Sequence, residues 1–222
     1  MKKGLDSGNG FVNPIPVTVS NLNIEEIYGM KMSKEKKKEI LLKNFEIIEN
    51  NYEKNSEAIS DIVRKMLLID IDTAVDMWIH LIKKYEHEVK NHNSFYITGG
   101  ISYYGGQDIG EAKMDKIILS TPELKNAYFS LMSEHTDVHC GSIIRNRISA
   151  NDLIVANELL ELLYNNPYRN DSWYDIMEMS MPWAHECQIT TEAYDLLEIW
   201  CDKVEDEEER AKLSIKMLEY FN

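Results

Sequence analysis

Residues 74–78 read Ala-Val-Asp-Met-Trp, and residues 156–160 (Ala-Asn-Glu-Leu-Leu) and 193–197 (Ala-Tyr-Asp-Leu-Leu) repeat that order of small, acidic and apolar side chains. In each segment an acid stands two positions after the alanine, and apolar residues stand three, four and seven positions after it. Positions with these spacings share one face of an α-helix. The pattern therefore predicts three amphipathic helices, each with an alanine in its buried stripe and an acid turned towards solvent.

The same helical spacing continues on both sides of these segments. Apolar residues three and four apart run through residues 41–52, 59–67 and 213–221. No stretch alternates apolar and polar residues as a half-buried strand would. The chain is therefore expected to be all-α, with about ten helices in stacked antiparallel hairpins, arranged either as an α-solenoid or as an irregular helical bundle.

Capping residues mark where these helices should begin. Ser, Thr and Asp side chains accept hydrogen bonds from the first backbone N–H groups of a helix. The expected N-caps are Ser33, Ser56, Asp72, Asp108, Thr121 (followed by Pro122 and Glu123), Asp171 or Ser172, Thr190 and Asp206. Trp173 and Trp183, which stand on either side of Pro182, are predicted to lie in the core.

The spacing of the alanine-led segments suggests an internal repeat. Two-helix solenoids have periods of ~34 to ~47 residues. With such a period the last two alanines lie one repeat apart and the first two lie about two repeats apart. The missing repeat between the first two predicts a degenerate copy near Ala112. Over residues 33–222 the chain thus resembles the HEAT-like and tetratricopeptide-like helical repeat proteins. The Gly and Tyr positions of the tetratricopeptide signature do not recur. The resemblance implies stacked helix pairs with a long groove for a protein partner.

The positions of the prolines and the extent of the helical pattern divide the chain into two expected regions. Residues 1–32 contain Pro14 and Pro16, which cannot donate backbone hydrogen bonds, and they predict an extended N-terminal arm. Within this arm Asn23-Ile24-Glu25-Glu26 has the form of a capping box and predicts a short helical turn. Residues 33–222 are expected to form a single α-helical domain.

Charge and composition restrict the class of partner. The 222 residues include 24 Lys and Arg against 38 Asp and Glu, a formal net charge of −14. Nucleic-acid binders usually carry a basic face, so no nucleic acid is expected, whereas a basic protein is. No apolar run approaches the ~18 residues of a membrane span, so no membrane association is expected. Three widely spaced cysteines predict no disulfide framework and favour a reducing, cytoplasmic location.

The glycine-rich segment 98–110 is predicted to be the longest loop of the domain. It lacks the Gly-Lys-Ser/Thr ending of a phosphate-binding loop. Tyrosine supplies a large contact area at a small entropic cost, so the segment is interpreted as a loop that presents its aromatic side chains to a partner. The expected partner-binding residues are Tyr96, Tyr103, Tyr104 and Asp108.

One polar cluster, Glu134-His135-Thr136-Asp137-Val138-His139-Cys140, contains side-chain types that bind zinc or iron. On a continuous helix His135 and His139 would share a face. Asp137 instead looks like a cap between two helices, which would point the histidines apart. His135, Asp137 and His139 are therefore weak metal candidates, and neither a metal nor another cofactor is expected.

The leading hypothesis is a non-enzymatic acidic module that binds a basic protein. A bacterial immunity protein or a phage inhibitor would fit the size and the acidity, and the heavy use of Asn, Ile, Lys and Glu is typical of low-GC bacteria and their phages. Two alternatives stay open: a metal-dependent hydrolase centred on His135, Asp137 and His139, and a structural or dimerising helical protein.

Overall fold

The computed structural model describes residues 29, 31–85, 95–130, 136–169, 172–184 and 188–221. Within these ranges it describes the backbone alone for residues 52, 53, 95–99, 136–139 and 221. Within these residues the chain forms eleven α-helices and no strand, so the all-α prediction is confirmed. The helices are α2 (Lys34–Ile48), α3 (Tyr52–Leu67), α4 (Ile71–Lys84), α6 (Phe95–Ile109), α7 (Glu111–Ser120), α8 (Pro122–Ser130), α9 (Thr136–Ser149), α10 (Leu153–Tyr164), α11 (Trp173–Ser180), α12 (Thr191–Cys201) and α13 (Glu207–Leu218). The predicted N-terminal arm lies almost entirely outside the described residues.

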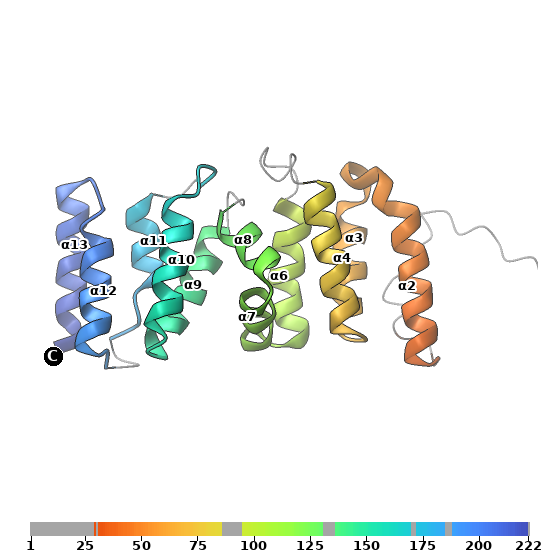
Figure 1. The fold of residues 1–222 in the computed structure, drawn as a ribbon, viewed down its shortest axis with the longest axis horizontal. Coiled ribbons are helices and arrows are strands. Elements are labelled where there is room, and N and C mark those ends of the chain that lie inside the picture. Colours follow the sequence, from red (N-terminus) through yellow and green to blue (C-terminus); the bar gives the residue numbers. More distant parts are fainter. Residues whose placement is uncertain are drawn as a thin grey trace, which may run out of the picture.

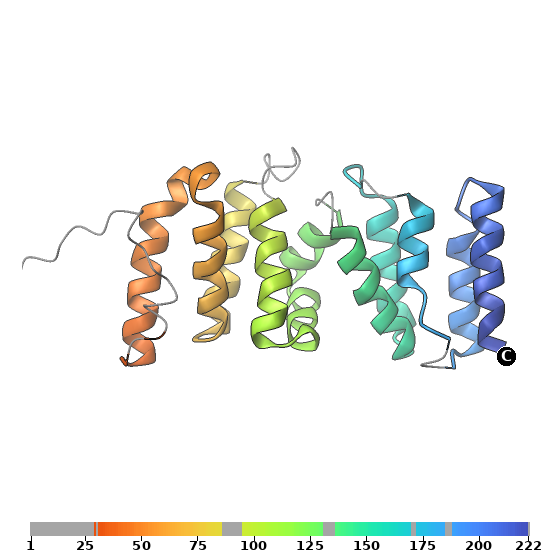
Figure 2. The same cartoon turned by 180° about the vertical axis from the view of Figure 1, so that it is seen from behind.

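The helices stand side by side in an elongated row that begins with α2 and ends with α13 (Figure 1). They form two layers. We call α4, α8, α10 and α12, which face the viewer in Figure 1, the alanine layer; each of these helices contacts the next. We call α3, α6, α9, α11 and α13, which face the viewer in Figure 2, the glycine layer; here α3 contacts α6, and α11 contacts both α9 and α13.

Every helix of the alanine layer buries one alanine. These residues are Ala74, Ala127, Ala156 and Ala193, and each is at most 1% exposed. Three of them lead the segments from which the helices were predicted, and the acids two positions later are exposed, as expected. The prediction of a degenerate copy near Ala112 is wrong, because Ala112 is exposed on α7. The position between α4 and α10 in the alanine layer is taken by α8, which buries Ala127.

Residues 98–109 of the glycine-rich segment are helical, and the prediction of a long loop there is wrong. They belong to α6, which packs along α3. A Cβ atom added at Gly100 would lie 2.8 Å from Ser60 Oγ, and one added at Gly105 would lie 2.5 Å from Met114 Cε. Glycine costs an isolated helix about 1 kcal/mol per residue relative to alanine, but here the missing Cβ atoms leave room for the side chains of Ser60 and Met114.

The glycine layer has a second close contact between α9 and α11. A Cβ atom added at Gly141 would lie 2.7 Å from Met179 Cβ and 3.3 Å from the Met179 carbonyl carbon. These atoms are fixed by the helix backbone, so they cannot rotate away. Gly110, by contrast, has φ = 94° and stands before α7 as its N-cap. The prediction that Asp108 caps this helix is therefore wrong.

Most predicted helix starts are confirmed. Side chains at four of the expected positions accept a backbone N–H three residues later: Ser33, Ser172, Thr190 and Asp206. Pro122 begins α8, also as expected. Besides the Asp108 cap, two starts are wrong. The helix α3 begins at Tyr52, ahead of Ser56, and α4 is capped by Asp70, whose carboxylate accepts from Thr73 N at 3.2 Å, rather than by Asp72.

The two tryptophans near Pro182 differ in burial. Trp173 is 6% exposed and lies in the core, as predicted, whereas Trp183 is 47% exposed and the core prediction for it is wrong. The helix α11 ends at Ser180, so helical spacing does not extend to Trp183, whose ring lies 4.4 Å from the guanidinium carbon of Arg145.

The cysteines that the structure describes are not bonded to one another. Cys140 and Cys201 are both buried and form no disulfide with each other, and Cys187 lies outside the described residues. Burial raises the pKa of the Cys201 thiol to about 12. Among the described helices, none combines the length and the apolar character needed to cross a bilayer.

The glycine contacts make a testable prediction for Gly141→Ala and Gly106→Ala. In Gly141→Ala the new methyl group overpacks against Met179, which costs about 1–3 kcal/mol of stability. This cost should exceed the gain in helix propensity of about 1 kcal/mol, so the free energy of unfolding should fall. In the second, a Cβ would meet only ordinary contacts of 3.7 and 3.8 Å with Glu111, so the free energy of unfolding should rise by about 0.5–1 kcal/mol. Urea unfolding measures both values; a change of the same sign in the two variants would contradict the packing argument.

Candidate functional site

The expected partner-binding tyrosines lie on a helix rather than on a loop. Tyr103 and Tyr104 belong to α6 and are 61% and 48% exposed, and their rings meet edge to face with centroids 5.0 Å apart. Tyr96 is in the first turn of the same helix, but its side chain lies outside the described residues. The two described tyrosines are therefore accessible for contacts with another molecule.

Asp108, the acidic member of that predicted set, is engaged within the chain. Its Oδ2 accepts hydrogen bonds from Arg64 Nε at 3.1 Å and Arg64 Nη2 at 2.8 Å. The Arg64 guanidinium also lies 5.0 Å from the centre of the Tyr104 ring and donates to Asp61 at 2.8 Å. Arg64 thus brings Tyr104 and Asp108 together and ties α6 to α3, so the Asp108 charge is already compensated.

The weak metal candidates are only partly described. The helix α9 begins at Thr136, so Asp137 and His139 have helical backbone and Asp137 does not separate two helices. Their side chains, and all of His135, lie outside the described residues. In the described part of the chain, no three His, Cys, Asp or Glu side chains gather where they could hold one ion.

Two neighbouring helices of the alanine layer together form a distinctive acidic surface. Neither α10 nor α12 contains a Lys or Arg, and the two helices contact each other. Each turns one stripe of carboxylates to solvent, and each adds one exposed isoleucine. We call this surface the acidic face; it consists of Ile154, Glu158, Glu161, Glu192, Asp195, Glu198 and Ile199.

Four of the five carboxylates of the acidic face are uncompensated. Lys125 of α8 forms an ion pair with Glu158. The other four make no ion pair with any residue in the ranges that the structure covers: Glu161, Glu192, Asp195 and Glu198. At physiological ionic strength such charges act over a Debye length of about 8 Å, so the two helices present a combined negative potential.

Buried contacts fix the acidic face in position. Ala156 and Ala193 point into the core from α10 and α12, which turns the opposite stripes of these helices outwards. Trp200 Nε1 of α12 donates a hydrogen bond to Asn157 Oδ1 of α10 at 2.9 Å. Ile154 is 87% exposed and Ile199 60% exposed, so the face combines charge with apolar surface, as a protein-binding surface does.

The sequence itself contains a signal for this face. The outward direction of Glu158 and Asp195 follows from the helical pattern. The complete lack of Lys and Arg in residues 153–164 and 191–201 is also visible in the sequence. The helical pattern does not show that these two segments become neighbours in one layer.

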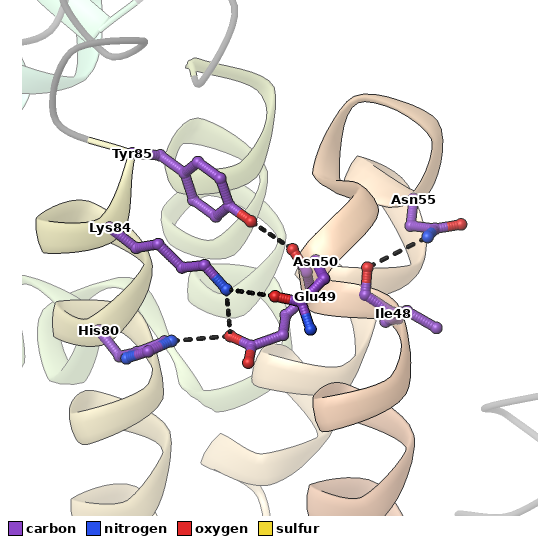
Figure 3. A network of polar contacts seen from close by, with 7 residues as sticks. All are labelled: Ile48, Glu49, Asn50, Asn55, His80, Lys84 and Tyr85. Atoms are coloured by element: carbon purple, nitrogen blue, oxygen red, sulfur yellow. Dashed lines mark hydrogen bonds and ion pairs between the residues drawn. The ribbon is translucent and has the colours of Figure 1, made fainter.

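A second polar cluster joins the end of α2 to α4 (Figure 3). The Glu49 carboxylate contacts His80 Nε2 at 2.7 Å and Lys84 Nζ at 3.4 Å, and its backbone carbonyl accepts a hydrogen bond from the Tyr85 hydroxyl. Lys84 also donates to Asn50 at 2.9 Å. Because these groups satisfy one another inside the chain, the cluster acts as a clamp that holds α2 on α4.

Comparison with known proteins adds no assignment. No protein-family model, no curated protein and no solved structure matches this chain. Its function is therefore inferred from its own residues, of which those of the acidic face form the most distinctive surface.

The link between α2 and α4 predicts a dependence of stability on pH. A hydrogen bond from the Lys38 ammonium, followed by those from Thr73, lowers the pKa of Asp70 from 3.8 to about 2. The folded state thus binds this proton less readily than the unfolded state, so the stabilisation is complete above about pH 4 and is lost as the pH falls towards 2. Asp70→Asn should remove this part of the pH dependence in urea unfolding.

Asp72→Asn is the matched control for this measurement, because Asp72 is exposed in the first turn of the same helix. It should leave the acid-induced loss of stability largely unchanged. An Asp70→Asn protein that loses as much stability between pH 4 and pH 2 as the unsubstituted protein would contradict the role of the Lys38–Asp70 contact.

Proposed function

We propose that this chain is a non-enzymatic binding protein whose acidic face docks a basic protein partner. One observation carries the proposal: two adjacent helices without any Lys or Arg expose four uncompensated carboxylates and two isoleucines. Carboxylates at a surface steer a positively charged partner and fix its orientation. Burial of the isoleucines would add the apolar contact that makes the complex last.

The charge of the whole chain supports the same class of partner. With a net charge of −14 the protein as a whole attracts basic molecules, and the acidic face offers carboxylates together with exposed apolar side chains. We include in the proposal the resemblance to HEAT-like and tetratricopeptide-like proteins, whose stacked helices present extended binding surfaces. An immunity protein that neutralises a basic toxin, or a phage inhibitor of a basic host protein, would use such a surface in the cytoplasm.

A charge-neutralising variant tests the acidic face. Glu161→Gln, Asp195→Asn and Glu198→Gln remove three negative charges without a change of shape. A basic partner captured from a lysate of the source cell by the unsubstituted protein should be bound roughly tenfold more weakly by this triple variant, since three exposed charges contribute about 0.5 kcal/mol each. Calorimetry with the purified partner at two salt concentrations gives the affinities, which should fall as salt increases.

The matched control removes the same three charges elsewhere. Glu46→Gln, Glu57→Gln and Asp72→Asn alter exposed acids of α2, α3 and α4, away from the acidic face, and should leave the affinity nearly unchanged. Equal losses in both triple variants would mean that only the overall charge matters. An affinity that does not respond to salt would contradict the proposal as a whole.

A further inference from the structure

A pocket of about 370 Å³ lies where α10 and α12 end and where α11 and α13 begin. The loops that form it connect α10 to α11 and α12 to α13, and both stand at the upper edge of the row in Figure 1. Its lining is aromatic, basic and acidic: Tyr164, Arg169, Ser172, Trp173, Lys203 and Glu205 belong to it, as do Tyr174, Val204, Asp206 and Glu209. Its size is within the range of small-molecule sites, about 300–1,000 Å³.

Two rings of the lining, those of Tyr164 and Trp173, form an aromatic wall that also packs against Trp200, which lies outside the lining. The centroid of the Tyr164 ring lies 4.9 Å from that of Trp173 and 5.8 Å from that of Trp200, and the two tryptophan rings lie 5.7 Å apart. Trp173 Nε1 donates a hydrogen bond to the Trp200 carbonyl oxygen at 2.9 Å. The wall is therefore rigid, although Tyr164 remains 37% exposed.

Two cations rest on this aromatic wall. The Arg169 guanidinium lies 5.4 Å from the centre of the Trp173 ring and 5.7 Å from that of Tyr164. The Lys203 ammonium lies 4.6 Å from the Trp200 ring and 4.8 Å from the Tyr164 ring. Cation–π contacts at these distances hold both side chains in place while most of their N–H donors stay available.

Acidic residues line the same pocket without neutralising these cations. Among the residues that the structure describes, neither Arg169 nor Lys203 forms an ion pair, although Glu205, Asp206 and Glu209 are also in the lining. Asp206 is held by a different contact, since its carboxylate caps α13 through Glu209 N at 2.9 Å. The pocket thus keeps opposite charges apart within one small space.

We propose that this pocket binds a small zwitterion of the amino-acid type. A carboxylate would receive hydrogen bonds from Arg169 and Lys203, which are both near the Tyr164 ring. An ammonium group of the same ligand would meet Glu205 and Glu209, which no ion pair engages among the described residues. Such a ligand satisfies both signs of charge at once, whereas a simple anion or cation would be repelled by one set of residues. The site is separate from the acidic face, so it is independent of the proposed protein partner.

Calorimetry with free amino acids tests the inference. We expect that at least one of glycine, L-leucine, L-glutamate and L-lysine binds saturably, and that its N-acetyl and amide derivatives bind about tenfold more weakly, because each lacks one of the two charges. Lys203→Met should weaken binding by a similar factor, whereas Lys203→Arg, which keeps the charge over the rings, should retain it. Thermal unfolding checks that every variant is folded.

Lys113→Met, which removes an exposed lysine of α7 outside the pocket, is the matched control and should bind like the unsubstituted protein. The inference is overturned if none of the four amino acids binds at ~10 mM, if Lys203→Met keeps full affinity, or if the N-acetyl derivative binds as tightly as the free amino acid. The triple variant of the acidic face should bind the amino acid normally, so failure of one proposal can be told from failure of the other.

Discussion

The close approach of helices at small residues is the contact on which the rest of this fold depends. In the glycine layer, Gly141 lets α9 lie against α11 at distances from Met179 that a Cβ would not allow, and Gly100 and Gly105 of α6 leave room for the side chains of Ser60 and Met114. In the alanine layer each helix buries one alanine. Short distances between helices increase the dispersion contacts per residue, and they also fix the rotation of each helix, since only the stripe with the small residue can face inwards.

That rotation decides which side chains are available for function. On α10 and α12 the buried stripes contain Ala156 and Ala193, so the carboxylates on the opposite stripes face solvent together. The hydrogen bond between Trp200 and Asn157 keeps the two stripes in a constant relation. The negative potential of the acidic face is therefore a consequence of core packing, because the same carboxylates on helices that were not neighbours would be separate weak charges.

Two groups of charged side chains in this protein have different roles. One group is paired across helices: Arg64 with Asp108, and Glu49 with His80 and Lys84 (Figure 3). These contacts hold the row of helices together. The other group, which includes Arg169 and Lys203, is held by aromatic rings instead of by carboxylates of the described residues. A charge that is positioned but not neutralised remains able to bind a ligand, which is why the second group marks the pocket.

Local rules in the sequence determined the helices and most of their starts, as at Ser33, Thr190 and Asp206, because periodicity and capping involve residues within one or two turns. They also determined which side of the alanine-led helices is buried. Only the tertiary structure decided that residues 98–109 are helical, since glycine is unfavourable in an isolated helix and the compensating contacts with Ser60, Leu67 and Met114 come from other segments. The pairing of α10 with α12 and the pocket were likewise decided by tertiary structure, because both join residues that are distant along the chain and meet only after the core has packed.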